Sequence, residues 1–207
     1  FNDPEQVSTQ SNKIGPDDWY NDYNSSFFMN NDGPPEFYHK SKLVVGVENF
    51  PYQDLLRPIL GDVMIDLGGT VAMKTTQANR EVFHLNNNWG TAPIICYESV
   101  YGDYVTGYVK NGANFLSIIT NDAWWADTQG HKQHLSYAKL RAIESRRSVV
   151  RSANTGISAF INEKGENVKR LAYEETGRIK HNITLKSKLT CYVKHGDYIA
   201  RMAQFMA

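Results

Sequence analysis

Continuous apolar runs alternate with a helical pattern in the middle third of this 207-residue chain. The runs at 91–97 (TAPIICY) and 114–120 (NFLSIIT) are typical of strands that are covered on both faces. Residues 100–111 have helical spacing, and Gly112 is well placed to end that helix. Strands separated by helices predict a mixed α/β sheet that is covered by helices.

The same alternation continues beyond residue 120. The best helical pattern lies at 134–149, where Leu135, Ala138 and Ala142 recur at i, i+3 and i+7. Further strands are predicted at 81–85, 149–153, 157–162, 167–173 and 178–185, and a terminal helix at 197–206. Gly156 supplies the backbone freedom for a tight turn between two of these strands.

The first third of the chain is less regular. Residues 1–35 are polar and predict a loop-like lead-in with one short strand at 26–29. Residues 37–52 are strand-like, and 55–70 suggest a short helix before a glycine turn. The chain contains neither an internal repeat nor a low-complexity tract, and its length suits one core. We therefore expect a single domain over residues 1–207.

Composition excludes several classes of protein. Lys plus Arg and Asp plus Glu both number 22, so the chain lacks the basic charge that nucleic-acid binding needs. Two cysteines, Cys96 and Cys191, cannot make a disulfide framework. The sequence has no apolar run of the roughly 18 to 20 residues that a membrane-spanning helix requires.

Cys96 stands at the end of a predicted strand, immediately before a helical segment. Open α/β sheets place reactive groups at such strand ends, and a helix start lowers the pKa of a thiol. Lys40 and Glu48 flank another strand-like segment and would complete an acyl-transfer site with this cysteine. The lysine could stabilise an oxyanion while a carboxylate handles the proton. Each residue alone could equally be structural.

Four segments in a fixed order carry a resemblance to a known family. They are YHKSKLVVGVENFPY (38–52), ICYES (95–99), TNDAWW (120–125) and RAIESRRSVVRSANTGIS (141–158). Together they resemble the apolipoprotein N-acyltransferases, bacterial inner-membrane enzymes whose extracytoplasmic domain belongs to the nitrilase, or carbon–nitrogen hydrolase, superfamily. The resemblance implies a nitrilase-like α-β-β-α sandwich of two mixed sheets with helices outside.

The resemblance also implies a role for each matched residue. Cys96 would be the nucleophile that takes an acyl chain as a thioester, Lys40 would hold the oxyanion, and Glu48 would lie near the substrate. Substrate-binding positions follow at Tyr97, Glu98, Asn121 and Trp124. The expected donor is a membrane phospholipid, and the expected acceptor is the N-terminal amine of a diacylated apolipoprotein. This reaction implies a place on the periplasmic side of the bacterial inner membrane, with no cofactor or metal.

One departure from the family pattern bears on activity. The general base of the superfamily is a glutamate in a PET-like motif upstream of the lysine, and these residues contain no such motif. Glu5 follows a proline but lies too close to Lys40 to match it. We therefore expect a domain that is incomplete on its N-terminal side and inactive unless Glu48 or Glu98 substitutes. A soluble amidase and an inactive lipid-binding module of the same fold remain alternatives.

The remaining polar residues have structural interpretations. His131 and His134 lie at i, i+3 without a third ligand, so we expect surface or capping roles rather than a metal site. Asn121 and Asp122 could form a turn or shape the site. An ion-pair network beneath the site is predicted from the helical spacing of Arg141, Glu144 and Arg147.

Overall fold

The computed structural model describes residues 11–13, 19–30, 33–44, 48, 74–86 and 88–206. The chain divides into two compact units, one made of residues 1–26 and 37–79 and the other of residues 27–36 and 80–207. The predicted helix at 55–70 and Glu5 lie outside the described residues. Each unit is described by itself.

The second unit is built on one six-stranded sheet with the order β12-β11-β10-β9-β8-β7. Its strands are β7 (Phe83–Asn86), β8 (Trp89–Ile95), β9 (Phe115–Thr120), β10 (Val149–Ala153), β11 (Ser158–Ile161) and β12 (Asn167–Leu171). The central strands β8, β9 and β10 are parallel, and the outer strands pair antiparallel. The sheet is therefore mixed, as predicted.

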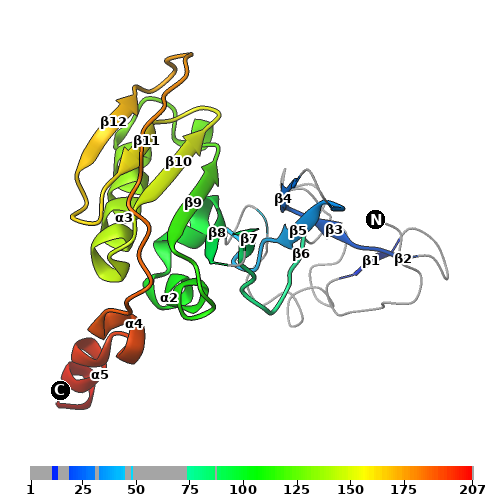
Figure 1. Ribbon diagram of the computed structural model, residues 1–207. Helices are drawn as coiled ribbons and strands as arrows, with labels where there is room; N and C mark the ends of the chain where they lie inside the picture. The colour runs from blue at the N-terminus through cyan, green and yellow to red at the C-terminus, as the bar shows by residue number, and fades with distance from the viewer. Residues whose placement is uncertain are drawn as a thin grey trace. The chain divides into compact units, whose positions relative to one another are not determined.

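Two helices, α2 (Gly102–Lys110) and α3 (Gln129–Ser145), connect the parallel strands and pack against each other (Figure 1). Alternate strand residues form the buried core, and pairing places Ala92 and Val149 beside Leu116 on one face. The opposite face is more open, with Ile119 50% exposed. Buried and more open residues thus alternate in β9 and β10, whereas β8 is buried on both faces.

The two helices begin and end for identifiable reasons. Helix α3 begins five residues before the predicted start because the Thr128 hydroxyl accepts the Gly130 N–H as an N-cap. It ends at Ser145, where Arg146 takes a left-handed backbone conformation. Helix α2 ends as predicted, and Gly112 has a φ of +104°.

The predicted strand at 178–185 is wrong. Residues 172–190 contain no strand; they run back past the sheet to α4 (Cys191–His195) and α5 (Tyr198–Met206) (Figure 1). Side chains rather than a strand ladder hold this segment, because Ser148 donates to the Thr184 carbonyl and Asn114 to the Lys186 carbonyl. We call residues 178–190 the return segment.

The first unit contains short strands where the sequence predicts a lead-in with one strand. They are β1 (Asn12–Lys13), β2 (Trp19–Tyr20), β3 (Asp22–Tyr23) and β6 (Lys74–Thr75), with β1 pairing β2 and β3 pairing β6. Strands β4 (Ser25–Phe28), which overlaps the strand predicted at 26–29, and β5 (Glu36–His39) form another pair, and the residues of both are divided between the two units. Among the described helices, none combines the length and apolar character needed to cross a membrane.

Candidate active site

Cys96 lies at the junction between β8 and the 3-10 helix η2 (Cys96–Val100). Its φ is +50°, a left-handed backbone conformation that costs a residue with a Cβ about 1–3 kcal/mol. The chain therefore turns sharply at Cys96, and the side chain is only partly buried. We call residues 95–100 the elbow.

Buried side chains stabilise the elbow from within. Glu98, which is fully buried, accepts the Ile95 N–H at 2.8 Å. The Ser99 hydroxyl donates to the Cys96 carbonyl at 2.9 Å, and Nε2 of His134 lies 3.2 Å from the same oxygen. These contacts offset the cost of the backbone conformation at Cys96.

Arg141 supports the other end of the elbow from α3. Its Nη1 donates to the Val100 carbonyl at 2.9 Å and to the Ser99 carbonyl at 3.3 Å, while Nη2 pairs with Glu144 at 2.8 Å. Burial raises the pKa of Glu144 despite this pairing. The predicted Arg141–Glu144 ion pair is confirmed, but Arg147 follows the end of α3 and donates to backbone carbonyls instead.

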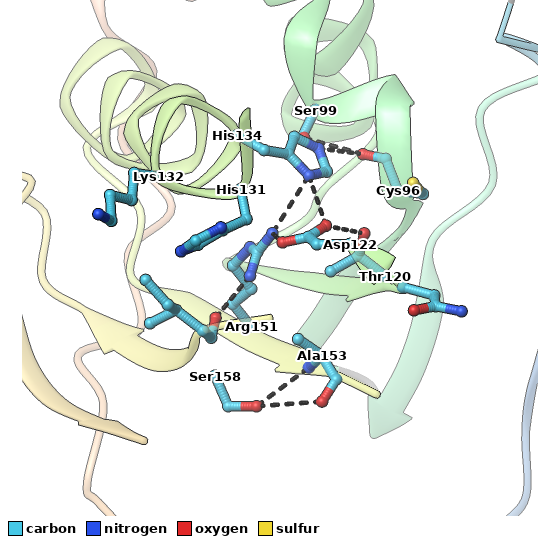
Figure 2. Close-up of polar contacts among 12 residues, drawn as sticks. Cys96, Ser99, Thr120, Asp122, His131, Lys132, His134, Arg151, Ala153 and Ser158 are labelled. Carbon is cyan, nitrogen blue, oxygen red and sulfur yellow. Dashed lines mark hydrogen bonds and ion pairs between the residues drawn. The ribbon is translucent and has the colours of Figure 1, made fainter. Parts of the chain in front are cut away.

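Asp122 forms the centre of a buried polar cluster beneath the elbow (Figure 2). Its Oδ2 pairs with Nη2 of Arg151 at 2.6 Å, and its Oδ1 lies 2.9 Å from Nδ1 of His134. The Thr120 hydroxyl also donates to Oδ1. Burial alone would raise the pKa of Asp122, but the His134 hydrogen bond and the Arg151 charge outweigh it and lower that pKa.

A tight turn at Gly156 approaches the carboxylate of Asp122 closely. Asp122 donates its N–H to the Thr155 carbonyl at 2.7 Å, and Gly156 follows with a φ of +136°. A Cβ at Gly156 would lie 2.6 Å from Oδ2 of Asp122. The tight turn predicted at 154–156 is therefore also required to leave room for this carboxylate.

The predicted substrate-binding residues have different surroundings. Trp124 is 76% exposed, and Asn121 is exposed with its side-chain oxygen accepting the Ala123 N–H. Tyr97 is half-buried and makes an edge contact with Tyr101. Glu98 is occupied with the elbow backbone, so its predicted contact with substrate stays a prediction, as do those of the other three residues.

Lys40 and Glu48 belong to the first unit, where they form a close pair. Nζ of Lys40, a buried residue, lies 2.6 Å from Oε2 of Glu48, which also accepts the Val44 N–H at 2.9 Å. Burial alone would raise the pKa of Glu48, but its bonds to Lys40 and Val44 lower it. The two side chains therefore lie together, and the predicted role of each in an acyl-transfer site stays a prediction.

Sequence reasoning missed the cluster. His131 and His134 were predicted to have surface or capping roles, yet both are buried in α3, at 1% and 2% exposure. The sequence does contain one signal: Arg151 is a charged residue within a predicted strand of the core sheet, and a charge that is buried there needs a partner. Within the described ranges, no group of His, Cys, Asp and Glu side chains could hold a metal ion.

Comparison with known proteins identifies the family to which this chain belongs. The carbon–nitrogen hydrolase family model matches residues 7–188. The apolipoprotein N-acyltransferase of Chlorobaculum tepidum is 31% identical over 185 residues, which cover 87% of this chain and 34% of the relative. That of Rhizobium meliloti is 39% identical over 141 residues, covering 68% and 26%. The chain thus spans about a third of the length of the curated relatives it matches.

A solved structure supports the fold. A mutant amidase from Nesterenkonia sp. AN1, with acrylamide added at its active-site cysteine, aligns with a TM-score of 0.50 and 12% identity. The alignment covers 82% of this chain and 57% of the amidase. This likeness confirms the predicted nitrilase-like fold and says nothing of the substrate. By fold and by sequence, the chain belongs to the carbon–nitrogen hydrolase family.

Proposed function

We propose that this protein is an N-acyltransferase that moves a fatty acyl chain from a phospholipid to an apolipoprotein through a thioester at Cys96. The observation that carries the proposal is the elbow: a partly exposed cysteine in a left-handed conformation, held by buried side chains at a strand end. The similarity to apolipoprotein N-acyltransferases supports the choice of donor and acceptor. Lipid substrates also suit the exposed Trp124.

The first half-reaction forms the thioester. The Cys96 thiol gives up its proton to a general base, a role for which the sequence leaves Glu48 or Glu98, and the thiolate sulfur attacks the ester carbonyl of the phospholipid to form a tetrahedral oxyanion; the base later returns the proton to the leaving group. The carbon–oxygen bond to the glycerol then breaks, and the lysophospholipid leaves with a proton on its oxygen. The role that the family resemblance implies for Lys40, which is paired with Glu48, is to stabilise this oxyanion through its N–H donors.

The second half-reaction releases the acyl chain. The N-terminal amine of a diacylated cysteine attacks the thioester carbonyl, an amide bond forms, and the carbon–sulfur bond breaks to restore Cys96. The amine loses a proton in this step, and the thiolate can regain one. We further propose that the reaction takes place at the periplasmic surface of a bacterial inner membrane, where both lipid substrates meet.

The test uses both substrates together. The protein is mixed with phosphatidylethanolamine in detergent and a diacylated N-terminal lipopeptide, and the peptide is analysed by mass spectrometry. We expect a peptide that gains one acyl chain with the wild type and not with Cys96→Ser. If the protein instead hydrolysed short-chain amides and left the peptide unchanged, the amidase alternative would replace this proposal.

A further inference from the structure

We propose that His134 is a positioning residue for Cys96, holding the carbonyl of the nucleophile through Nε2 while Asp122, itself paired with Arg151, holds the imidazole ring at Nδ1. The inference rests on the proposed role of Cys96 as the nucleophile. It adds to the elbow a side chain from a helix that lies 38 residues further along the chain.

The Nε2 side of the ring meets the backbone of the elbow. Nε2 lies 3.2 Å from the Cys96 carbonyl oxygen and 3.1 Å from the Ser99 hydroxyl. Figure 2 shows that the contact with Cys96 ends on its carbonyl oxygen, while the sulfur lies on the side of the residue away from the ring. His134 therefore acts on the conformation of the nucleophile rather than on its sulfur.

The Nδ1 side of the ring faces the side chains of Asp122 and Arg151. Nδ1 lies 2.9 Å from Oδ1 of Asp122, just after β9, and 3.2 Å from Nη2 of Arg151 in β10. Arg151 is itself held by its pairing with Asp122 and by donation to the Ile157 carbonyl. His134, Asp122 and Arg151 are each at most 2% exposed, so water does not readily replace a lost contact.

This arrangement matters because the backbone of Cys96 is strained. With a φ of +50°, the residue would relax to an ordinary extended or helical conformation if the elbow loosened. The carbonyl that His134 contacts belongs to the rigid peptide plane between Cys96 and Tyr97. Rotation of that plane would redirect the thiol, and a misplacement of about 1 Å can cost roughly 100-fold in rate.

Two variants separate the two sides of the ring. His134→Gln places an amide nitrogen near the position of Nε2, so it can still donate to the Cys96 carbonyl. His134→Asn places its amide nearer to Nδ1, so it can reach Asp122 but not the elbow. The matched control is His131→Gln, because His131 is equally buried in α3 but contacts the Ala126 carbonyl and the Tyr173 ring instead.

The first measurement needs no activity. Deuterium uptake of peptides that cover residues 95–100 is compared among the wild type and the three variants. We expect faster exchange in the elbow for His134→Asn, and wild-type exchange there for His134→Gln and His131→Gln. Unchanged exchange in His134→Asn, or equally fast exchange in all three variants, would overturn the inference.

The second measurement follows acylation of Cys96 by p-nitrophenyl butyrate, an activated ester that needs no lipid site. For His134→Asn we expect the acylation rate constant to fall about 10- to 100-fold with little change in KM, and for His134→Gln to recover most of the rate. Equal rates for the two variants would contradict the inference. A wild type that reacts with this ester but not with phospholipid would refute the proposed function alone.

Discussion

Two arginines, Arg147 just before β10 and Arg151 in the middle of it, show how differently this fold uses a buried charge. Arg151 lies inside the strand and pairs with Asp122, which in turn contacts His134. Arg147 precedes the strand and donates to the carbonyls of Ala113, Ser145 and Lys188. Both are almost fully buried, at 2% and 1% exposure.

The partners of the two arginines decide what each of them does in the fold. Carbonyl oxygens belong to the backbone, so Arg147 ties together chain segments, including the return segment. Burial lowers the pKa of its guanidinium. Arg151 instead holds a carboxylate that orients a ring against the nucleophile. Arg147 therefore supports the architecture of the unit, and Arg151 supports the positioning of Cys96.

The largest expected effect on stability comes from removing the carboxylate that pairs with Arg151. Asp122→Ala leaves the Arg151 charge buried without its carboxylate, and breaking such a pair costs about 3–5 kcal/mol. We expect the free energy of unfolding to fall by that amount in urea denaturation, and acylation of the remaining folded protein to be slower. Normal stability in this variant would contradict the assignment of Asp122 as the centre of the cluster.

Substitution of Arg147 should lower the stability of the protein without loss of site function. Arg147→Met removes donors from three backbone carbonyls, and we expect a loss of about 2–3 kcal/mol in the free energy of unfolding. Limited proteolysis should cut the return segment faster, because Lys188 is one of its anchors. Alkylation of Cys96 by iodoacetamide should keep its wild-type rate. A clear change in that rate would show that Arg147, like Arg151, affects Cys96, and would contradict the difference between the two arginines.

A pair of glycines sharpens the comparison. Gly156→Ala and Gly112→Ala both place a Cβ at a positive φ, but only at Gly156 would it meet Asp122. The difference between the two variants thus isolates the close contact from the backbone strain. We expect Gly156→Ala to be less stable than Gly112→Ala by about 1 kcal/mol in thermal unfolding. Equal losses would show that the turn moves away from Asp122 at little cost.

The smallest expected effect is on the pH dependence of stability. The pKa of Asp122 is lower in the folded protein than in the unfolded chain, where it is about 3.9. Its contribution is therefore present above that pH and is lost as the pH falls through the folded pKa. Between pH 6 and pH 3 the wild type should lose more stability than Asp122→Asn, while Arg147→Met should follow the wild-type slope. Parallel curves for wild type and Asp122→Asn would contradict this.

The sequence predicted what depends on local patterns. Apolar runs located β8, β9 and β10, and the strand end located Cys96, because both signals lie within a few neighbouring residues. The strand predicted at 178–185 was wrong, because the side chains of Asn114 and Ser148 bind that segment without a ladder of strand hydrogen bonds. Asp122, His134 and Arg151 come from a loop, a helix and a strand, and only the fold brings them together.

The most direct test of the proposed thioester is to look for an acyl group on Cys96. The protein is incubated with palmitoyl-oleoyl phosphatidylethanolamine in detergent, quenched in acid and analysed by intact mass, beside Cys96→Ser. We expect a fatty-acyl adduct on the wild type that hydroxylamine removes and that Cys96→Ser lacks. An adduct that persists in Cys96→Ser, or no adduct on the wild type, would contradict it.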